Sequence, residues 1–242
     1  MDNIILASKS LVRKKILEEN GISCVVEPAN IDEDLIKESL LNKGESPQII
    51  SKNLAELKAN KISNKKNGKL VLGADSIIDY NGNIISKPSN REEALIILKK
   101  LNGQKHYLIS SVCISKNGSM IWNYTDKAVL TMKQMTNDEL KSYLTKIKDA
   151  TLYSYNVYQI EGEGRSLFSK IEGDENTIMG LPINQIKEYL KKMYHTDNQL
   201  TIPISGTGSA GMEACFVNLI EPDDNVLVLI NGVFGMRMED VA

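Results

Sequence analysis

The chain has 242 residues, enough for one large domain with a remainder or for two small domains. Its 29 basic and 31 acidic residues give a formal net charge of −2, so no bulk basic excess points to nucleic acid. The chain enters its first expected strand without a signal peptide, and no apolar run is long enough to span a bilayer. Three scattered cysteines without a C-x-x-C pair favour reduced thiols. We therefore expect a cytoplasmic protein that binds neither nucleic acid nor membranes.

The first segment joins a short apolar run, residues 4–7, to a stretch with helical spacing through small hydroxyl residues. We expect a strand that turns into a helix capped by Ser8 or Ser10. The free backbone N–H groups of such a corner suit an anion with several negative charges, such as a triphosphate. Arg13 and the two lysines after it would add positive charge. An ordinary capped helix with a solvated basic face is the alternative.

The next predicted elements are a strand and two helices. The strand covers residues 23–27, one helix ends near Gly44, and the other begins at Pro47 and covers residues 48–62. Glu33 lies in the acidic run before the first of these helices, where an acid usually caps a helix or favours its dipole. Lys58 falls one residue after the apolar stripe of the second helix, so it could reach inward or be solvated.

A buried strand is predicted over residues 69–75, ended by Gly73, with Asp75 at its C-terminal end. Ligands of α/β sheets gather at that end of a strand, which makes Asp75 the strongest candidate among the acids. Asn81-Gly82 is then the strongest short signal for a hairpin. A capping box, Ser89-x-x-Glu92, opens the helix that follows.

The second half of the chain contains two long strands and two helices. The strands cover residues 104–115 and 120–132, and the capping box Thr136-x-x-Glu139 opens a helix to about residue 148. A glycine-punctuated stretch, residues 155–182, separates it from a helix that starts at Pro182 and reaches about residue 194. The two histidines, His106 and His195, are expected in a turn and a linker, not in a zinc pair.

Four blocks occur in order along the chain: LASKS..RK..L, GADS, SKP followed by EA..IL..L.G..H, and YQIEGEG...F..IEGD...I.GLP. Together they resemble the Maf family of nucleoside triphosphate pyrophosphatases over about residues 3–192. The resemblance implies a Maf- and ITPase-like domain over residues 1–193, an elongated α/β fold with a mixed sheet, flanking helices and a central nucleotide cleft. It also implies a hydrolase in which water attacks the α-phosphorus of a nucleotide with Mg²⁺ or Mn²⁺, giving the monophosphate and pyrophosphate, and a possible homodimer.

The resemblance carries the family's site residues onto matching positions. It implies that Asp75 is the catalytic base, that Glu33 and Asp75 hold the metal, and that the substrate is bound by Ser10, Arg13, Lys58, Lys87 and Glu161. A triphosphate bears about four negative charges, so Arg13, Lys58 and Lys87 would neutralise and orient it. The acid beside the phosphates favours an enzyme over the alternative, a nucleotide-binding regulator of septum formation, because a pure binder would not need it.

The sequence departs from the family pattern in three places. Leu11 and Val12 replace the proline and the first arginine of the first loop, which puts one phosphate contact in doubt. Residues around Ser154-Tyr155-Asn156 replace a lysine-alanine-glycine run that is frequent in the family, and Asn156 can still hold a left-handed turn. Glu161 replaces a glutamine. The lost arginine and the gained glutamate together are like the subgroup that prefers 7-methylguanosine triphosphate over uridine and thymidine nucleotides.

Residues 201–242 are similar to an early segment of class V aminotransferases of the alanine–glyoxylate type. The loop of residues 205–209, SGTGS, matches the one that holds the phosphate of pyridoxal phosphate in that family. The later strands, the aspartate facing the cofactor ring and the Schiff-base lysine have no counterpart in this sequence. We therefore expect residues 194–242 to form a linker and a short, truncated α/β fragment without a functional pyridoxal phosphate site.

Overall fold

The computed structural model describes residues 4–149, 152, 156–193, 208–219, 226–228, 230 and 233–241 of the chain. Two compact units are distinguished, Ile4–Thr201 and a smaller unit of Met1–Asn3 with Ile202–Ala242. The larger unit contains all of the blocks quoted above. A domain boundary between residues 193 and 194 stays a prediction.

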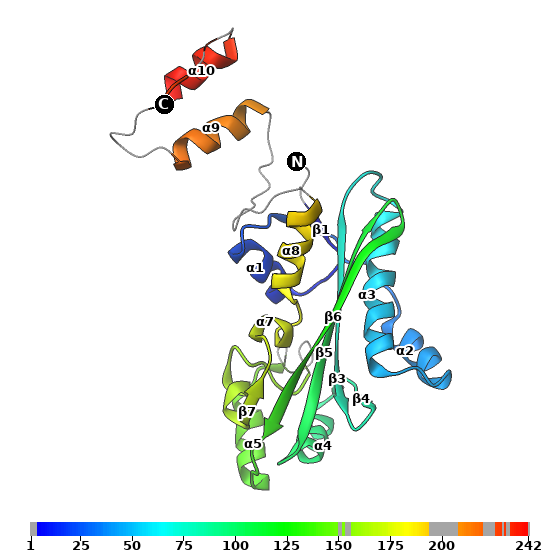
Figure 1. The fold of residues 1–242 in the computed structure, drawn as a ribbon. Coiled ribbons are helices and arrows are strands. Elements are labelled where there is room, and N and C mark those ends of the chain that lie inside the picture. The colour runs from blue at the N-terminus through cyan, green and yellow to red at the C-terminus, as the bar shows by residue number, and fades with distance from the viewer. Residues whose placement is uncertain are drawn as a thin grey trace. The chain divides into compact units, whose positions relative to one another are not determined.

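The larger unit is built on a seven-stranded mixed sheet with the order β2-β1-β3-β5-β6-β7, in which β4 also pairs with β3 (Figure 1). Its strands are β1 (Ile4–Leu6), β2 (Cys24–Val26), β3 (Val71–Tyr80), β4 (Asn83–Ile85), β5 (Lys105–Lys116), β6 (Ser119–Met132) and β7 (Phe168–Glu172). β1 runs parallel to β2 and β3, and the other pairings are antiparallel. The predicted α/β class with a mixed sheet is confirmed.

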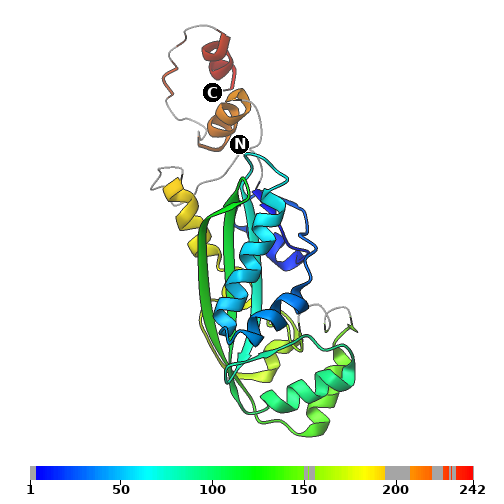
Figure 2. The same cartoon turned by 90° about the vertical axis from the view of Figure 1, so that its right-hand side faces the viewer.

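Helices flank the sheet on both faces (Figures 1 and 2). They are α1 (Leu11–Glu19), α2 (Glu33–Asn42), α3 (Pro47–Ser63), α4 (Arg91–Leu101), α5 (Asn137–Lys146), α7 (Glu175–Ile178) and α8 (Ile183–Met193), with the 3₁₀ helix η1 (Glu163–Leu167). Because side chains alternate along a strand, successive residues of β3 meet different helices. Leu72 and Ala74 share a core with α1 and α8, whereas Val71 shares one with α3.

The strand predicted to end at Gly73 continues to Tyr80, so that prediction is wrong. Gly73 has another purpose, because a Cβ placed on it would overlap Ala55 O and lie 2.7 Å from Ala59 N. The helix α3 therefore packs directly on the backbone of β3 at this point. The close approach brings α3 side chains within reach of the middle of the strand.

One edge of β3 is paired only near its two ends. β1 pairs with Val71 and Leu72, and β4 pairs with residues 78–80. Among the described residues, no strand pairs with residues 73–77 on that edge, while β5 pairs with them on the other. The sheet is therefore open between β1 and β4, next to the centre of β3.

Local turn and cap signals were reliable predictors, with one exception. Asn81 and Gly82 both have positive φ, 53° and 79°, in the predicted hairpin, and the capping box of Thr136 and Glu139 is present. The box Ser89-x-x-Glu92 is wrong by one residue. The cap is Asn90, which accepts from Glu93 N at 2.8 Å, and the Glu93 carboxylate in turn accepts from Ser89 N and Oγ.

His106 lies inside β5 and is fully buried, so its expected place in a turn is wrong. Its Nε2 lies 2.9 Å from the hydroxyl of Tyr158. Burial lowers the pKa of His106 to about 4, because the charged imidazolium is poorly solvated there. Tyr158 and Phe168 pack around its ring. His195 lies outside the described residues.

The described part of the smaller unit consists of the helices α9 (Gly208–Leu219) and α10 (Val233–Val241), with no strand among its described residues. Arg237 Nη2 and Glu213 Oε2, one from each helix, form an ion pair of 2.9 Å. Leu219, Leu227 and Val233 are at least 76% exposed. Residues 205–207 of the predicted phosphate loop lie outside the described residues, and the aminotransferase-like character stays a prediction. Among the described helices, none is long and apolar enough to cross a membrane.

Candidate active site

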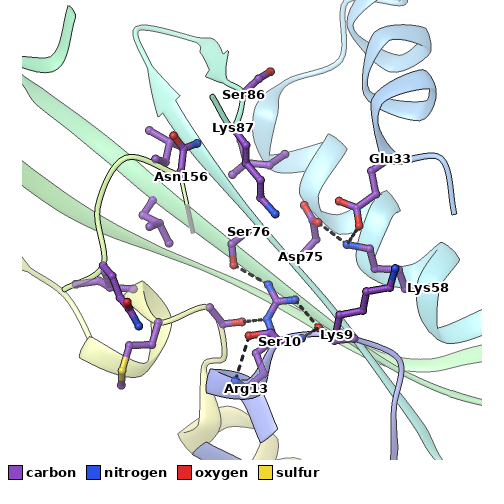
Figure 3. A pocket seen from close by; sticks show the side chains of 18 of the residues that line it. Lys9, Ser10, Arg13, Glu33, Lys58, Asp75, Ser76, Ser86, Lys87 and Asn156 are labelled. Carbon is purple, nitrogen blue, oxygen red and sulfur yellow. Dashed lines mark hydrogen bonds and ion pairs between the residues drawn. The ribbon is translucent and has the colours of Figure 1, made fainter. Parts of the chain in front are cut away.

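The opening in the sheet leads into a pocket of about 570 Å³. Its walls come from the β1–α1 loop, the segment from the end of β2 into α2, the middle of β3, α3, the segment after β4, and the loops around residues 156–161 and 178–180. All residues predicted from the resemblance line it, although they come from distant parts of the chain: Ser10, Arg13, Glu33, Lys58, Asp75, Lys87 and Glu161. Figure 3 shows six of these seven residues, labelled, around one space.

Asp75 lies in the middle of β3, not at its C-terminal end as predicted. It shares the strand face of Gly73, so it points toward α3 and not toward α1. Lys58 of α3 donates to Asp75 Oδ1 at 2.7 Å and pairs with Glu33 Oε1 at 2.9 Å (Figure 3). Asp75 and Lys58 are only 4% and 7% exposed, so their pairing is shielded from water. Of the two alternatives for Lys58, the inward one is correct.

Glu33 stands at the first position of α2, behind its cap Asp32. Partial burial acts to raise the pKa of Glu33, but the charge and hydrogen bond of Lys58, with the charges of Lys37 and Lys87, act against it. The result is a pKa below the ordinary value of a glutamate. Glu33 is therefore held as a carboxylate in the wall of the pocket.

Asp75 Oδ2 is buried and has no hydrogen-bond partner among the described residues. Leaving a buried carboxylate oxygen unpaired is unfavourable, so this atom is suited to a further ligand. Carboxylate oxygens are the donors that Mg²⁺ and Mn²⁺ prefer, commonly one or two together with phosphate and water oxygens. The described residues contain no group of three or more His, Cys, Asp or Glu side chains placed to hold an ion. Glu33 and Asp75 thus fit the protein's share of a site completed by a phosphate.

Arg13 belongs to the first turn of α1, which Ser10 caps by accepting from Arg13 N at 3.3 Å. The guanidinium is engaged by protein acceptors: it donates to Ala74 O at 2.9 Å, Gly180 O at 2.9 Å, Ser76 Oγ at 3.0 Å and Ser8 Oγ at 3.2 Å. Leu72 O, on the same edge of β3, accepts from Ala7 N of the chain just after β1. Arg13 donates to Ala74 O, the next carbonyl on that edge, where the pairing of β3 with β1 has ended.

Gly180 is needed for this arrangement. Its φ of +94° is rarely adopted by other residues, and a Cβ there would lie 2.9 Å from Ser76 Oγ and 3.3 Å from Arg13 Nε. Arg13 therefore joins the β1–α1 loop, the middle of β3 and the Gly180 loop across one side of the pocket. No local sequence signal indicates these partners.

Lys87 reaches the pocket from the segment after β4 (Figure 3). Desolvation lowers its pKa, the charge of Glu33 opposes this, and the neighbouring positive charges of Lys37, Arg13 and Lys58 lower it further. Its pKa lies below the ordinary value of a lysine. Within the described part of the chain, Lys87 makes no hydrogen bond or ion pair. Lys9 and Ser76 also line the pocket, and the sequence analysis did not select either of them.

The loop of residues 156–161 closes another side of the pocket. Asn156 has φ +69°, which confirms the predicted left-handed turn, and its Nδ2 donates to Ile85 O at the end of β4. Glu161 is exposed, and its Oε1 accepts from Gln159 Nε2 at 2.7 Å within the same loop. The carboxylate is thus at the pocket wall with one hydrogen bond from its own loop.

The family model described as "Maf-like protein" matches residues 3–193. A protein of Pelagibacter ubique named nucleoside triphosphate pyrophosphatase is 73% identical over 188 residues, 78% of this chain and 96% of that protein. One of the same name from Roseobacter denitrificans is 37% identical over 187 residues, 77% of this chain and 94% of that protein. A solved HAM1 protein from Coxiella burnetii is 13% identical with a TM-score of 0.43, over 81% of this chain and 99% of that one. On the family match and these identities, the chain belongs to the Maf-like family.

Proposed function

We propose that this protein hydrolyses a nucleoside triphosphate to the nucleoside monophosphate and pyrophosphate. The observation that carries the proposal is the buried pair of Asp75 and Lys58, set at the open edge of β3 in a pocket rich in basic side chains. A carboxylate kept out of bulk water beside several cations suits the activation of water next to a polyphosphate. Both relatives described above bear the name of this activity.

In the proposed reaction a water oxygen bonds to the α-phosphorus, and the bond from that phosphorus to the bridging oxygen of the β-phosphate breaks. The Asp75 carboxylate takes a proton from the water, and pyrophosphate leaves with the electron pair of the broken bond. Lys58, which donates to Oδ1, holds the carboxylate in one orientation and balances its charge. A divalent cation bound by Glu33 and Asp75 would supply charge stabilisation to the phosphate oxygens. The chemistry requires positioning and charge, without a covalent nucleophile.

The substrate would be held by groups on several walls of the pocket. The Ser10 oxygen already accepts from Arg13 N, so its hydroxyl hydrogen can be donated to a phosphate oxygen. Lys87 offers an ammonium without a protein partner among the described residues. Arg13 contributes charge and also fixes the β1–α1 loop, since four protein acceptors engage its guanidinium. Lys58 contributes mainly through the two carboxylates that it orients.

Glu161 would help to select the nucleobase of the substrate. A carboxylate only accepts hydrogen bonds, so it suits the N1–H and N2 amino donors of guanine. Methylation at N7 makes guanine cationic and adds charge attraction. Uracil and thymine present one N–H between two carbonyl oxygens, which a glutamine amide meets better. We therefore propose a modified guanosine triphosphate, of the 7-methyl type, as the preferred substrate class.

The test is a panel of nucleoside triphosphates that includes 7-methylguanosine triphosphate, with pyrophosphate and orthophosphate measured separately. The wild type should release pyrophosphate, and Asp75→Asn should lower turnover by about 10²- to 10⁴-fold while nucleotide binding remains. Asp79→Asn is the matched control. Asp79 lies on the same face of β3, is nearly as buried, and accepts from Gly82 N outside the pocket.

Turnover of Asp75→Asn within about tenfold of the wild type would remove Asp75 from the chemistry. Nucleotide binding without pyrophosphate release from any member of the panel would refute hydrolysis. It would favour a binding protein instead.

A further inference from the structure

The basic side chains of the pocket differ in how far they are engaged by the protein. Five line it, against three acidic ones: Lys9, Arg13, Lys37, Lys58 and Lys87 against Glu33, Asp75 and Glu161. Lys58 binds two carboxylates, Arg13 donates to four protein acceptors, and Lys37 lies 3.9 Å from Glu33. Lys9 and Lys87 make no hydrogen bond or ion pair within the described residues. These two are therefore the ammonium groups best able to accept a new anion.

The backbone around Lys9 is fixed, although its side chain is exposed. Ser10 N donates to Ser8 Oγ at 3.2 Å, and Arg13 Nη1 donates to the same oxygen at 3.2 Å. The corner is also anchored by Ser10, which caps α1. A lysine on such a corner loses little backbone freedom when it binds, so most of its attraction to an anion is retained.

Lys9 and Lys87 come into the pocket from opposite sides, with Asp75 between them (Figure 3). Lys87 comes from the segment after β4, and Lys9 from the loop before α1. A polyphosphate whose reacting phosphorus lies near Asp75 would therefore have an unengaged ammonium on each side. The carboxylates of Glu33 and Asp75 both pair with Lys58, and neither of them forms an ion pair with Lys9.

We propose that Lys9 is a substrate-binding residue that contacts the polyphosphate of the nucleotide. The inference rests on the proposed function and extends it to a residue outside the set that the family resemblance supplied. It also accounts for Val12, an apolar residue where a cation was expected, because Lys9 of the same loop brings a positive charge to the pocket. A triphosphate carries about four negative charges, and a lysine on a flexible stem can follow them as a point charge.

The experiment compares Lys9→Met with Lys52→Met. Lys52 is an exposed lysine of α3 that does not line the pocket and, like Lys9, makes no hydrogen bond or ion pair within the described residues. Lys9→Met should raise KM for the triphosphate about tenfold with kcat within about twofold, because the contact exists in both the ground state and the transition state. The increase should shrink as salt is raised, and Lys9→Arg should restore most of the affinity. Lys52→Met should leave both constants unchanged.

Inorganic pyrophosphate and the phosphate-free nucleoside separate phosphate binding from a structural effect. Lys9→Met should weaken pyrophosphate binding by about the same factor as KM, and should leave nucleoside binding unchanged. A KM equal to that of Lys52→Met, or an equal loss for the nucleoside, would overturn the proposal. If the wild type hydrolysed no triphosphate, the proposed function would be refuted. Pyrophosphate binding by wild type and Lys9→Met, measured by calorimetry, would still decide the role of Lys9, and no difference between them would refute it.

Discussion

Ser76 Oγ on β3 lies 2.9 Å from Ser110 Oγ on the neighbouring strand β5. Ser110 donates its hydroxyl hydrogen to Thr177 O at 2.7 Å, so it must accept from Ser76. Ser76 in turn accepts from Arg13 Nη2 at 3.0 Å. The hydrogen bonds therefore run in one direction, from Arg13 through two hydroxyls to the backbone of α7. This series of hydrogen bonds links one wall of the pocket to the interior of the sheet.

Replacing Ser110 by alanine should disturb the pocket from a distance. The Ser76 hydroxyl and the Thr177 carbonyl would each lose a buried partner, which costs about 1–3 kcal/mol of unfolding free energy. With Ser76 released, Arg13 would be held less firmly, and we expect kcat/KM to fall by about tenfold. Urea denaturation and steady-state kinetics measure the two effects.

Ser115→Ala is the control for Ser110→Ala. Ser115 also belongs to β5, is equally buried, and donates to Asn60 Oδ1 at 2.7 Å, and neither of these two residues lines the pocket. The Ser115→Ala variant should have a lower free energy of unfolding and an unchanged kcat/KM. Equal losses of kcat/KM in the two variants would show that the hydrogen bonds through Ser76 and Ser110 do not specifically support the pocket.

Glu161→Gln should change the preference among bases. An amide provides a donor as well as an acceptor, so the efficiency on 7-methylguanosine triphosphate should fall relative to that on uridine or thymidine triphosphate. A polar site with correctly paired groups discriminates more strongly than shape alone, and we expect the ratio to change by about tenfold or more. The measurement is kcat/KM on the nucleotide panel. An unchanged ratio would leave Glu161 as a loop residue bonded to Gln159.

A chain that ends at residue 193 should keep pyrophosphatase activity, because the pocket and the whole family match precede that point. Loss of solubility or activity on truncation would assign a structural role to residues 194–242.

The full chain with added pyridoxal phosphate should develop no absorbance of an internal aldimine. Such absorbance would contradict the expected absence of a pyridoxal phosphate site.

Stability should fall in mild acid because of His106. Its pKa is about 4 in the folded chain against about 6.5 when unfolded, so between these values the unfolded state binds more protons. The stabilisation is complete above about pH 6.5 and decreases as the pH falls toward 4, by at most about 3 kcal/mol. Urea unfolding at several pH values should show a smaller decrease for His106→Gln than for wild type. An equal decrease in both would exclude His106 as the cause, and His195→Gln serves as the control.

Short-range signals in the sequence predicted most of the fold. Asn81-Gly82 and the capping box of Thr136 act within a few residues, so their outcome depends little on the rest of the chain. The shifted cap at Asn90 shows the limit of this approach, because Ser89 and Asn90 precede two consecutive glutamates and either pairing satisfies the pattern. The choice between them is made by geometry that the sequence does not display.

The contacts within the site could not be predicted from local patterns in the sequence, because they join residues that are far apart in the chain. The strand β3 reads as two pieces, because Asp75 and Ser76 interrupt its apolar run, and only the gap between β1 and β4 explains why polar residues occur there. The sequence likewise gives no reason to place His106 beside Tyr158 or to engage Arg13 with backbone carbonyls. The family resemblance identified residues of the pocket, whereas their contacts required the structure.

The register of β3 determines which groups meet in the pocket. Asp75 and Ser76 are neighbours in the chain but serve opposite faces of the strand, one toward Lys58 and the other toward Arg13. The pairing with β5 continues from Val71 to Asp79 without a bulge. A shift by a single residue would therefore turn Asp75 to the face of Arg13 and Ser76 to the face of Lys58, even in an otherwise intact sheet. Insertions within β3 should thus abolish the chemistry, whereas the turn at Asn117-Gly118, remote from this strand's centre, can vary in length without exchanging the partners.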